Sequence, residues 1–218
     1  VTMEEPDLAR DALERGEFAS ALELLEGADP SCDRAELLEL RAQAAYGAGE
    51  FEEAVQAWED LHQLHLEQND PVSAATAAAM IAMYLMMDTG LMAPVRGWLR
   101  TAERLLAGFD ETAAHALIAM TRTYERFMSG DMGEAQNQAV LAIDLGTRND
   151  VNPAVVIGRV AAARIRIFEG DVQGGLDQLE EVGALLMSGG ADPLTTGMMY
   201  CEIICAAQGL ALHDMASQ

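Results

Sequence analysis

The sequence contains no lysine: all 13 of its basic residues are arginines, and they stand against 36 acidic residues for a formal net charge of -23. Affinity for nucleic acid and for anionic membranes comes from cationic side chains that neutralise phosphates, so both would repel a surface this acidic. We therefore expect no direct binding to nucleic acid and no membrane partner.

Cysteines, aromatic residues and long apolar runs are also scarce. Cys32, Cys201 and Cys205 cannot form a disulfide framework in a chain of 218 residues, which fits a reducing compartment. The longest apolar stretch, residues 74–87, is too short to span a bilayer and favours a buried helix. Residues 1–5 lack the basic and apolar segments of a signal peptide, so we expect a cytoplasmic protein.

The residues that are abundant favour helices. Half of the chain is apolar, while aromatics contribute only 5%, and β-branched residues are thin outside residues 151–167. Ala, Leu, Met and Glu dominate, and all four are strong helix formers. The composition predicts an all-α fold with a substantial core.

A short signature recurs along the chain: a glycine, a residue that is often acidic, an apolar residue, two variable residues and a small one. Clear copies begin at Gly16, Gly49, Gly130 and Gly170, a weaker copy begins at Gly90, and a degenerate copy begins at Ala211. Glycine accepts the left-handed conformation that ends a helix, and an acidic residue suits the start of the next helix. Successive copies start 33, 41, 40, 40 and 41 residues apart, which predicts about six helix hairpins.

Proline marks several boundaries between these hairpins. Pro71, Pro153 and Pro193 each lie where the first helix of a pair would begin, a position that tolerates proline. We predict eleven helices and the start of a twelfth, in one domain over residues 1–218 whose last repeat is incomplete. A hairpin of amphipathic helices cannot bury its own apolar faces, so the pairs should stack into a right-handed α-solenoid with a concave and a convex side.

The signature resembles tetratricopeptide (TPR) repeats over nearly the whole chain. Residues 98–106, 170–186 and 197–201 look like the repeat region of actinobacterial LuxR-type transcription regulators. In that family a tyrosine–cysteine pair recurs near the start of a late repeat, and Tyr200 and Cys201 match it. This resemblance implies a sensor or coupling role, with the DNA-binding domain outside these residues.

The sequence has no nucleophile elbow, phosphate loop or dinucleotide fingerprint, so we expect no enzyme activity and no cofactor. Glu59, His62 and His65 stand three residues apart, which is half of a di-iron pattern. We interpret them as a solvated helix face and predict no metal site. Cys201 and Cys205 lie one helical turn apart, and we interpret them as small buried residues at a helix crossing rather than a metal or redox pair.

Methionine, unlike cysteine, is abundant: the chain has 13 copies, several of them in residues 80–92. Methionine fills irregular cores and also lines adaptable binding surfaces. We interpret these methionines as core packing.

An arginine stripe is the strongest candidate for a binding site. In the first helix of the fourth pair, His115, Arg122 and Arg126 lie opposite the apolar face, and in the next pair Arg159 and Arg166 occupy the corresponding stripe. Tyr200 roughly matches Arg159 in the sixth pair. On the concave side these residues would form a groove for a carboxylate, a phosphate or an acidic peptide. The alternative is salt bridging to Glu125, Glu169 and their neighbours, with no ligand.

These observations favour a non-catalytic TPR binding or sensor module. The first hypothesis is recognition of a protein or peptide in the concave groove, in a LuxR-like regulator or a signalling protein. The second is sensing of a small anion or metabolite. The third is self-association through the last helix, which would make the protein a homodimer.

Overall fold

The computed structural model describes residues 5–29, 31–187 and 192–216, and these residues form eleven α-helices and no β-strand. The helices are α1 (Glu5–Glu14), α2 (Phe18–Glu26), α3 (Arg34–Ala48), α4 (Phe51–Glu67), α5 (Pro71–Thr89), α6 (Met92–Leu105), α7 (Ala113–Met128), α8 (Met132–Arg148), α9 (Asn152–Phe168), α10 (Val172–Met187) and α11 (Pro193–Ala216). The prediction of an all-α fold is confirmed.

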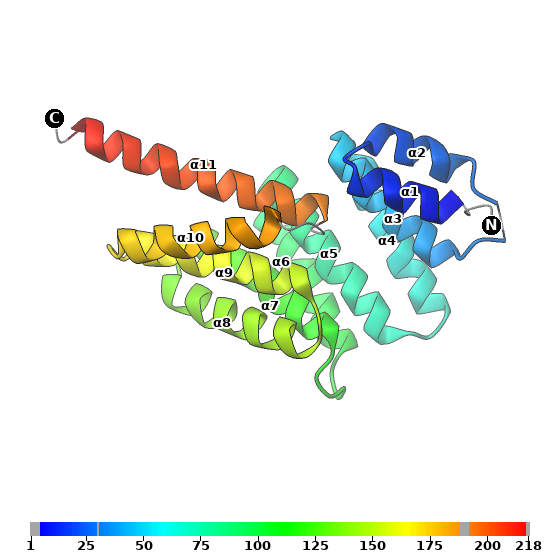
Figure 1. The fold of residues 1–218 in the computed structure, drawn as a ribbon. Helices are drawn as coiled ribbons and strands as arrows, with labels where there is room; N and C mark the ends of the chain where they lie inside the picture. The colour runs from blue at the N-terminus through cyan, green and yellow to red at the C-terminus, as the bar shows by residue number, and fades with distance from the viewer. Residues whose placement is uncertain (1–4, 30, 188–191, 217–218) are drawn as a thin grey trace.

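Five helix hairpins stack side by side, from α1–α2 to α9–α10 (Figure 1). A signature glycine occupies the turn inside each hairpin, and each has a positive φ: 72° at Gly16, 84° at Gly49, 64° at Gly90, 80° at Gly130 and 98° at Gly170. A side chain with a Cβ atom would strain the backbone at these positions. The sequence signature therefore locates all five turns.

The small residue of the signature lies where the two helices of a hairpin cross. Ala21, Ala54 and Ala135 are completely buried. A Cβ atom added to Gly175 would lie 2.6 Å from the carbonyl oxygen of Ala163, so α9 and α10 leave room only for glycine there. Small residues set the close approach of the paired helices.

Helix α5 lies at the centre of the molecule and packs against α4, α6 and α7. Among the described residues it is the one helix long and apolar enough to span a membrane, but 61% of its apolar window is buried inside the protein. Met83 and Met86 are among its most buried side chains. For these residues the interpretation as core packing is confirmed.

The prediction of a twelfth helix is wrong. Helix α11 continues without a break to Ala216, through the degenerate signature that begins at Ala211. Alanine stands there in place of the glycine that ends a first helix elsewhere, and alanine favours helix continuation. With 24 residues, α11 is longer than the other helices of the described chain.

Helix α11 also brings distant parts of the chain together. Its first turns lie against α3 as well as α9 (Figure 1). Leu194 and Met198 of α11 are buried in the same apolar cluster as Tyr84 of α5. The last helix therefore closes part of the inner face formed by the first helices.

The backbones of α3 and α5 stay apart, although both are first helices of adjacent pairs. The rings of Tyr46 on α3 and Tyr84 on α5 fill the space between them, with centroids 4.8 Å apart. Trp58 of α4 packs against Tyr84 at 6.0 Å. These bulky rings hold the two helices apart, whereas alanines dominate the close contacts of α5 with its other neighbours.

Candidate functional site

The predicted arginines Arg122 and Arg126 lie on α7, and both pair with carboxylates. Arg122 is mostly buried and donates from Nε and Nη2 to Oε1 of Glu103 on α6, at 3.0 and 2.7 Å. Arg126 Nε lies 3.2 Å from Glu125 Oε2, and its Nη1 lies 4.0 Å from Asp131 Oδ2. Salt bridging, the alternative to a ligand groove, is thus present at both positions.

Glu125 is the centre of this network, and its side chain is only 1% exposed. Arg96 of α6 donates from Nε to Glu125 Oε1 at 2.7 Å, and Arg122 Nη1 lies 3.5 Å from Oε2. Desolvation acts to raise the pKa of Glu125, but the hydrogen bond from Arg96 and the charges of Arg126, Arg96 and Arg122 outweigh it, so the pKa lies below its ordinary value. The network ties α6 to α7.

Arg166 repeats the arrangement of Arg126 forty residues later. Its Nε donates to Asp171 Oδ2 at 2.9 Å, just as Arg126 lies beside Asp131. Arg166 and Arg159 line a polar groove of about 360 Å³ between α9 and α10, together with Asp177 and Glu181. The predicted arginines therefore lie near carboxylates both on α7 and on α9.

His115 and Tyr200 have different surroundings. The ring nitrogen Nδ1 of His115 accepts a hydrogen bond from the backbone N–H of Thr112 at 3.1 Å, so His115 caps the start of α7. Tyr200 is 58% exposed on α11. It is the counterpart of Arg159 at the 41-residue spacing between the starts of α9 and α11. A ligand at these six positions stays a prediction.

Two interpretations of sequence patterns are wrong. His62 is buried rather than solvated, since its Nδ1 lies 2.8 Å from the carbonyl oxygen of Ala74 and its ring packs on Trp98. Cys201 and Cys205 are exposed rather than buried. Desolvation and the neighbouring Cys205 raise the pKa of Cys201, which disfavours its reactive thiolate form. Among the described residues, no three His, Cys, Asp or Glu side chains gather as metal ligands.

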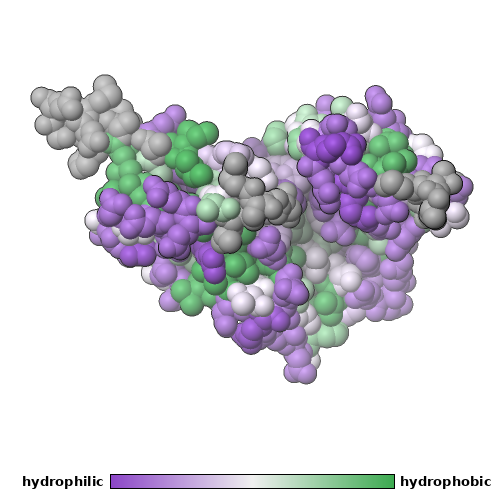
Figure 2. Space-filling model, viewed as in Figure 1, coloured by the Kyte–Doolittle hydropathy of each residue, from purple (hydrophilic) through white to green (hydrophobic). Residues whose placement is uncertain are grey.

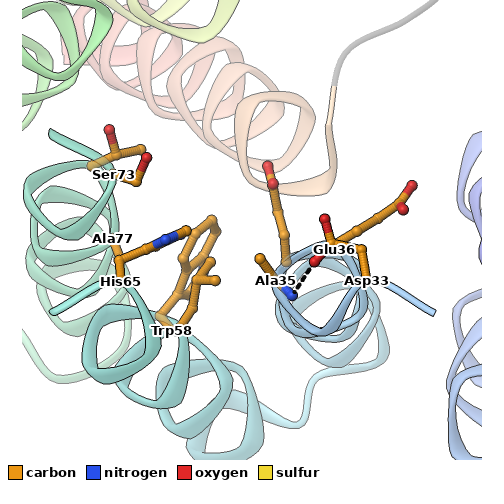
Figure 3. Close-up of a pocket in the computed structure, with 10 residues that line it drawn as sticks. Asp33, Ala35, Glu36, Trp58, His65, Ser73 and Ala77 are labelled. Atoms are coloured by element: carbon orange, nitrogen blue, oxygen red, sulfur yellow. Dashed lines mark hydrogen bonds between the residues drawn. The ribbon is translucent and has the colours of Figure 1, made fainter. Parts of the chain in front are cut away.

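A cleft of about 320 Å³ lies between α3 and α5, and nothing in the sequence predicted it. Asp33, Ala35 and Glu36 form one side, Ser73 and Ala77 form the other, and Trp58 and His65 of α4 lie between them (Figure 3). The cleft opens beside the point where the tyrosine rings hold α3 and α5 apart. Trp58 is the one aromatic residue among the described residues of its lining, and no pattern in the sequence marked the cleft.

The α3 wall of the cleft is acidic. It carries Asp33, Glu36 and Glu39, of which Asp33 caps α3 by accepting a hydrogen bond from the N–H of Ala35 at 2.9 Å. Glu39 is exposed to solvent, but the walls remove part of its hydration shell, and this desolvation raises its pKa. His65 lowers the pKa of Glu39, Glu36 raises it further, and Arg10, which pairs with Glu36, lowers it.

These charges define what the cleft can bind. Three carboxylates on one wall attract a cation, and the hydroxyls of Ser73 and Thr76 on the other wall add polar character. Trp58, which is only 4% exposed, contributes an aromatic ring to the lining of the cleft. A volume of this size admits a lysine or arginine side chain rather than a folded domain.

No protein-family model matches the chain, and no curated protein matches it in sequence. Solved structures with the same architecture include TPR-repeat proteins. One is a P. anserina protein named for kinesin light chain and built of nearly identical TPR-like repeats: 19% identity, TM-score 0.56, covering 83% of this chain and 92% of that one. BtubC (BKLC) from P. vanneervenii shares 16% identity, with TM-score 0.58 and coverage of 85% and 81%. A thermophilic TPR protein from Thermus thermophilus shares 16%, with TM-score 0.57 and coverage of 92% and 97%. The chain has the TPR fold.

Proposed function

We propose that this chain is a non-catalytic protein-binding module that accepts a basic side chain of a partner peptide in the cleft between α3 and α5. TPR-fold neighbours support a protein-interaction repeat module in general terms. The observation that carries the finer proposal is the wall of Asp33, Glu36 and Glu39 facing a cleft of side-chain size.

The energetics favour a cation in this cleft over an anion at the arginines. A lysine or arginine entering the cleft would compete with Arg10 at Glu36. At Asp33 and Glu39, which form no ion pair among the described residues, it gains charge-assisted hydrogen bonds, each worth about 1.5–3 kcal/mol. An anion at Arg122, Arg126 or Arg166 would have to compete with the carboxylates already paired there. The arginine set is retained as the second candidate, for an acidic peptide or small anion.

A titration with two labelled peptides of equal length, one lysine-rich and one glutamate-rich, tests both candidates by fluorescence anisotropy. We expect the basic peptide to bind, and the double variant Glu36→Gln/Glu39→Gln to weaken binding about tenfold or more, which corresponds to 1.4 kcal/mol. Because the pKa of Glu39 is raised, binding should weaken with falling pH before an ordinary glutamate would become protonated.

The control variant Glu23→Gln/Glu26→Gln makes the same change of charge on exposed residues of α2. It isolates the general attraction of a basic peptide to a chain of net charge -23. If both double variants weaken binding equally, the cleft is not the site. Binding of the acidic peptide, lost in Arg126→Ala/Arg166→Ala, would favour the second candidate instead.

The regulatory setting is a further part of the proposal. The resemblance of residues 98–106, 170–186 and 197–201 to LuxR-type regulators supports a sensor or coupling role for the module. In that setting the bound peptide would belong to a signalling partner, and DNA binding would be carried by another domain.

A further inference from the structure

The first helices α9 and α11 begin 41 residues apart, at Asn152 and Pro193, so they can be compared position by position. Position 160 corresponds to 201, and position 163 corresponds to 204. In α9, Val160 and Ala163 are buried in one cluster with Leu179 and Val182 of α10. This is the face on which the second helix of the hairpin packs.

The same face is open on α11. Val160 is completely buried, but Cys201 is exposed, and Tyr200 beside it is 58% exposed. Ala163 is completely buried, but Ile204 is 52% exposed and its neighbour Ile203 is 37% exposed. No helix of the described residues covers these side chains in the way that α10 covers α9. Figure 2 shows hydrophobic surface along this part of α11.

The open face carries almost no charge. Between Gly197 and Leu210 the single charged residue is Glu202, and it is 13% exposed and lies 2.8 Å from Nε of Arg164. The exposed residues around it are Tyr200, Cys201, Ile203, Ile204 and Cys205. Two such faces can therefore meet without bringing like charges together, although each chain carries a net charge of -23.

We propose that this face of α11 binds the same face of a second copy of the chain. The two helices of each hairpin run antiparallel, and a twofold axis perpendicular to α11 makes two copies of it antiparallel as well. Each α11 then lies on the other as α10 lies on α9. Burial of Tyr200, Ile203 and Ile204 drives the contact, since these apolar side chains leave water on both copies.

This arrangement has a characteristic salt dependence. The contact itself is apolar, while the rest of the two chains repel each other through their acidic surfaces. Salt screens that repulsion, so the dimer should become stronger as sodium chloride rises from roughly 50 to 500 mM. An interface held by ion pairs would weaken instead. The proposal does not depend on the peptide-binding cleft, which lies between α3 and α5.

Sedimentation equilibrium of the whole chain tests the proposal. A contact of two helices is at the small end of stable interfaces, below about 1,200 Å² of total buried area. We therefore expect a weak dimer, with a dissociation constant of roughly 5 to 500 μM. Ile203→Glu places a carboxylate near the same carboxylate of the second chain. It should raise the dissociation constant of the dimer about tenfold or more. Val140→Glu adds the same charge at a residue that is 55% exposed on α8, and it should leave the dimer unchanged. Circular dichroism confirms that both variants keep the helical fold.

Three results would overturn the proposal. The first is a measured mass equal to one chain at every concentration. In that case this face of α11 would bind a different protein rather than a second copy. The second is a dimer that Ile203→Glu does not weaken, or that Val140→Glu weakens equally. The third is a dimer that dissociates as salt is raised.

Discussion

Glu125 is a buried carboxylate that the fold keeps ionised. Its three arginine neighbours come from two helices, Arg96 from α6 and Arg122 and Arg126 from α7. A buried charge is tolerated only when it is paired and hydrogen-bonded, and removing one partner leaves the others uncompensated. The stability of the α6–α7 contact should therefore depend on the protonation of this one side chain.

Glu125→Gln should destabilise the protein at pH 7 by roughly 2 kcal/mol or more. The pKa of Glu125 is lower in the folded chain than in the unfolded chain, where it is about 4.3. Its contribution is therefore complete above that unfolded value and is lost as the pH falls through the folded one. Urea unfolding at pH 7, 5, 4 and 3 should show the gap between variant and wild type closing below about pH 4.

A matched control is Glu103→Gln, which removes a surface partner of Arg122 whose side chain is 44% exposed. Exposed ion pairs contribute about 0–1 kcal/mol, so this variant should stay close to wild type at each pH. A constant gap for Glu125→Gln across the pH series would contradict the assignment of a depressed pKa.

The sequence indicated some of these residue environments and not others. Arg122 and Arg126 lie beside Glu125 on one helix, so periodicity alone brings them together. Arg96 is 29 residues away and its role depends on how α6 crosses α7, which no local pattern records. The same reason explains the errors at His62 and Cys205: their exposure is decided by neighbouring helices.

Glycine at the crossing of α9 and α10 is a requirement of packing. A Cβ atom at position 175 would lie 2.5 Å from Cγ1 of Ile167, so Gly175→Ala should destabilise the protein by about 1–3 kcal/mol. Gly133 of α8 offers the contrast, because a Cβ atom there would meet nothing within 4 Å. Gly133→Ala should stabilise the chain by about 0.5–1 kcal/mol, since alanine is the better helix former.

Urea unfolding at neutral pH measures both variants. The prediction concerns the opposite signs of the two changes rather than their sizes. Two destabilised variants would mean that helix α8 is strained at Gly133, and two stabilised variants would mean that α9 and α10 are farther apart than the structure shows.

The hairpins were predictable because each is specified by neighbouring residues. A glycine with positive φ, the residues after it and a small residue one turn later lie within six positions of one another. The cleft was not predictable, since its lining residues come from α3, α4 and α5, helices of two different hairpins. The path of α11 was only partly predicted: Pro193 marks its start, but its contact with α3 bridges about 150 residues of sequence.

The whole molecule carries far more negative than positive charge, which destabilises the compact state through self-repulsion. We expect the midpoint of thermal unfolding to rise as sodium chloride increases from roughly 50 to 500 mM, because salt screens this repulsion. The measurement uses the Ile203→Glu variant at low concentration, so that self-association does not contribute. A midpoint that falls with salt would mean that the surface ion pairs outweigh the net repulsion.

The contact of α11 with α3 also restricts the shape of any peptide that enters the inner face. An extended peptide that ran along the first helices in order would meet α11 at the second pair, where α11 contacts α3. The cleft beside Trp58 is accessible instead to a chain end or to the tip of a tight loop. The cleft would therefore select a partner whose basic side chain projects from a chain end or a tight turn. A long extended peptide would be excluded.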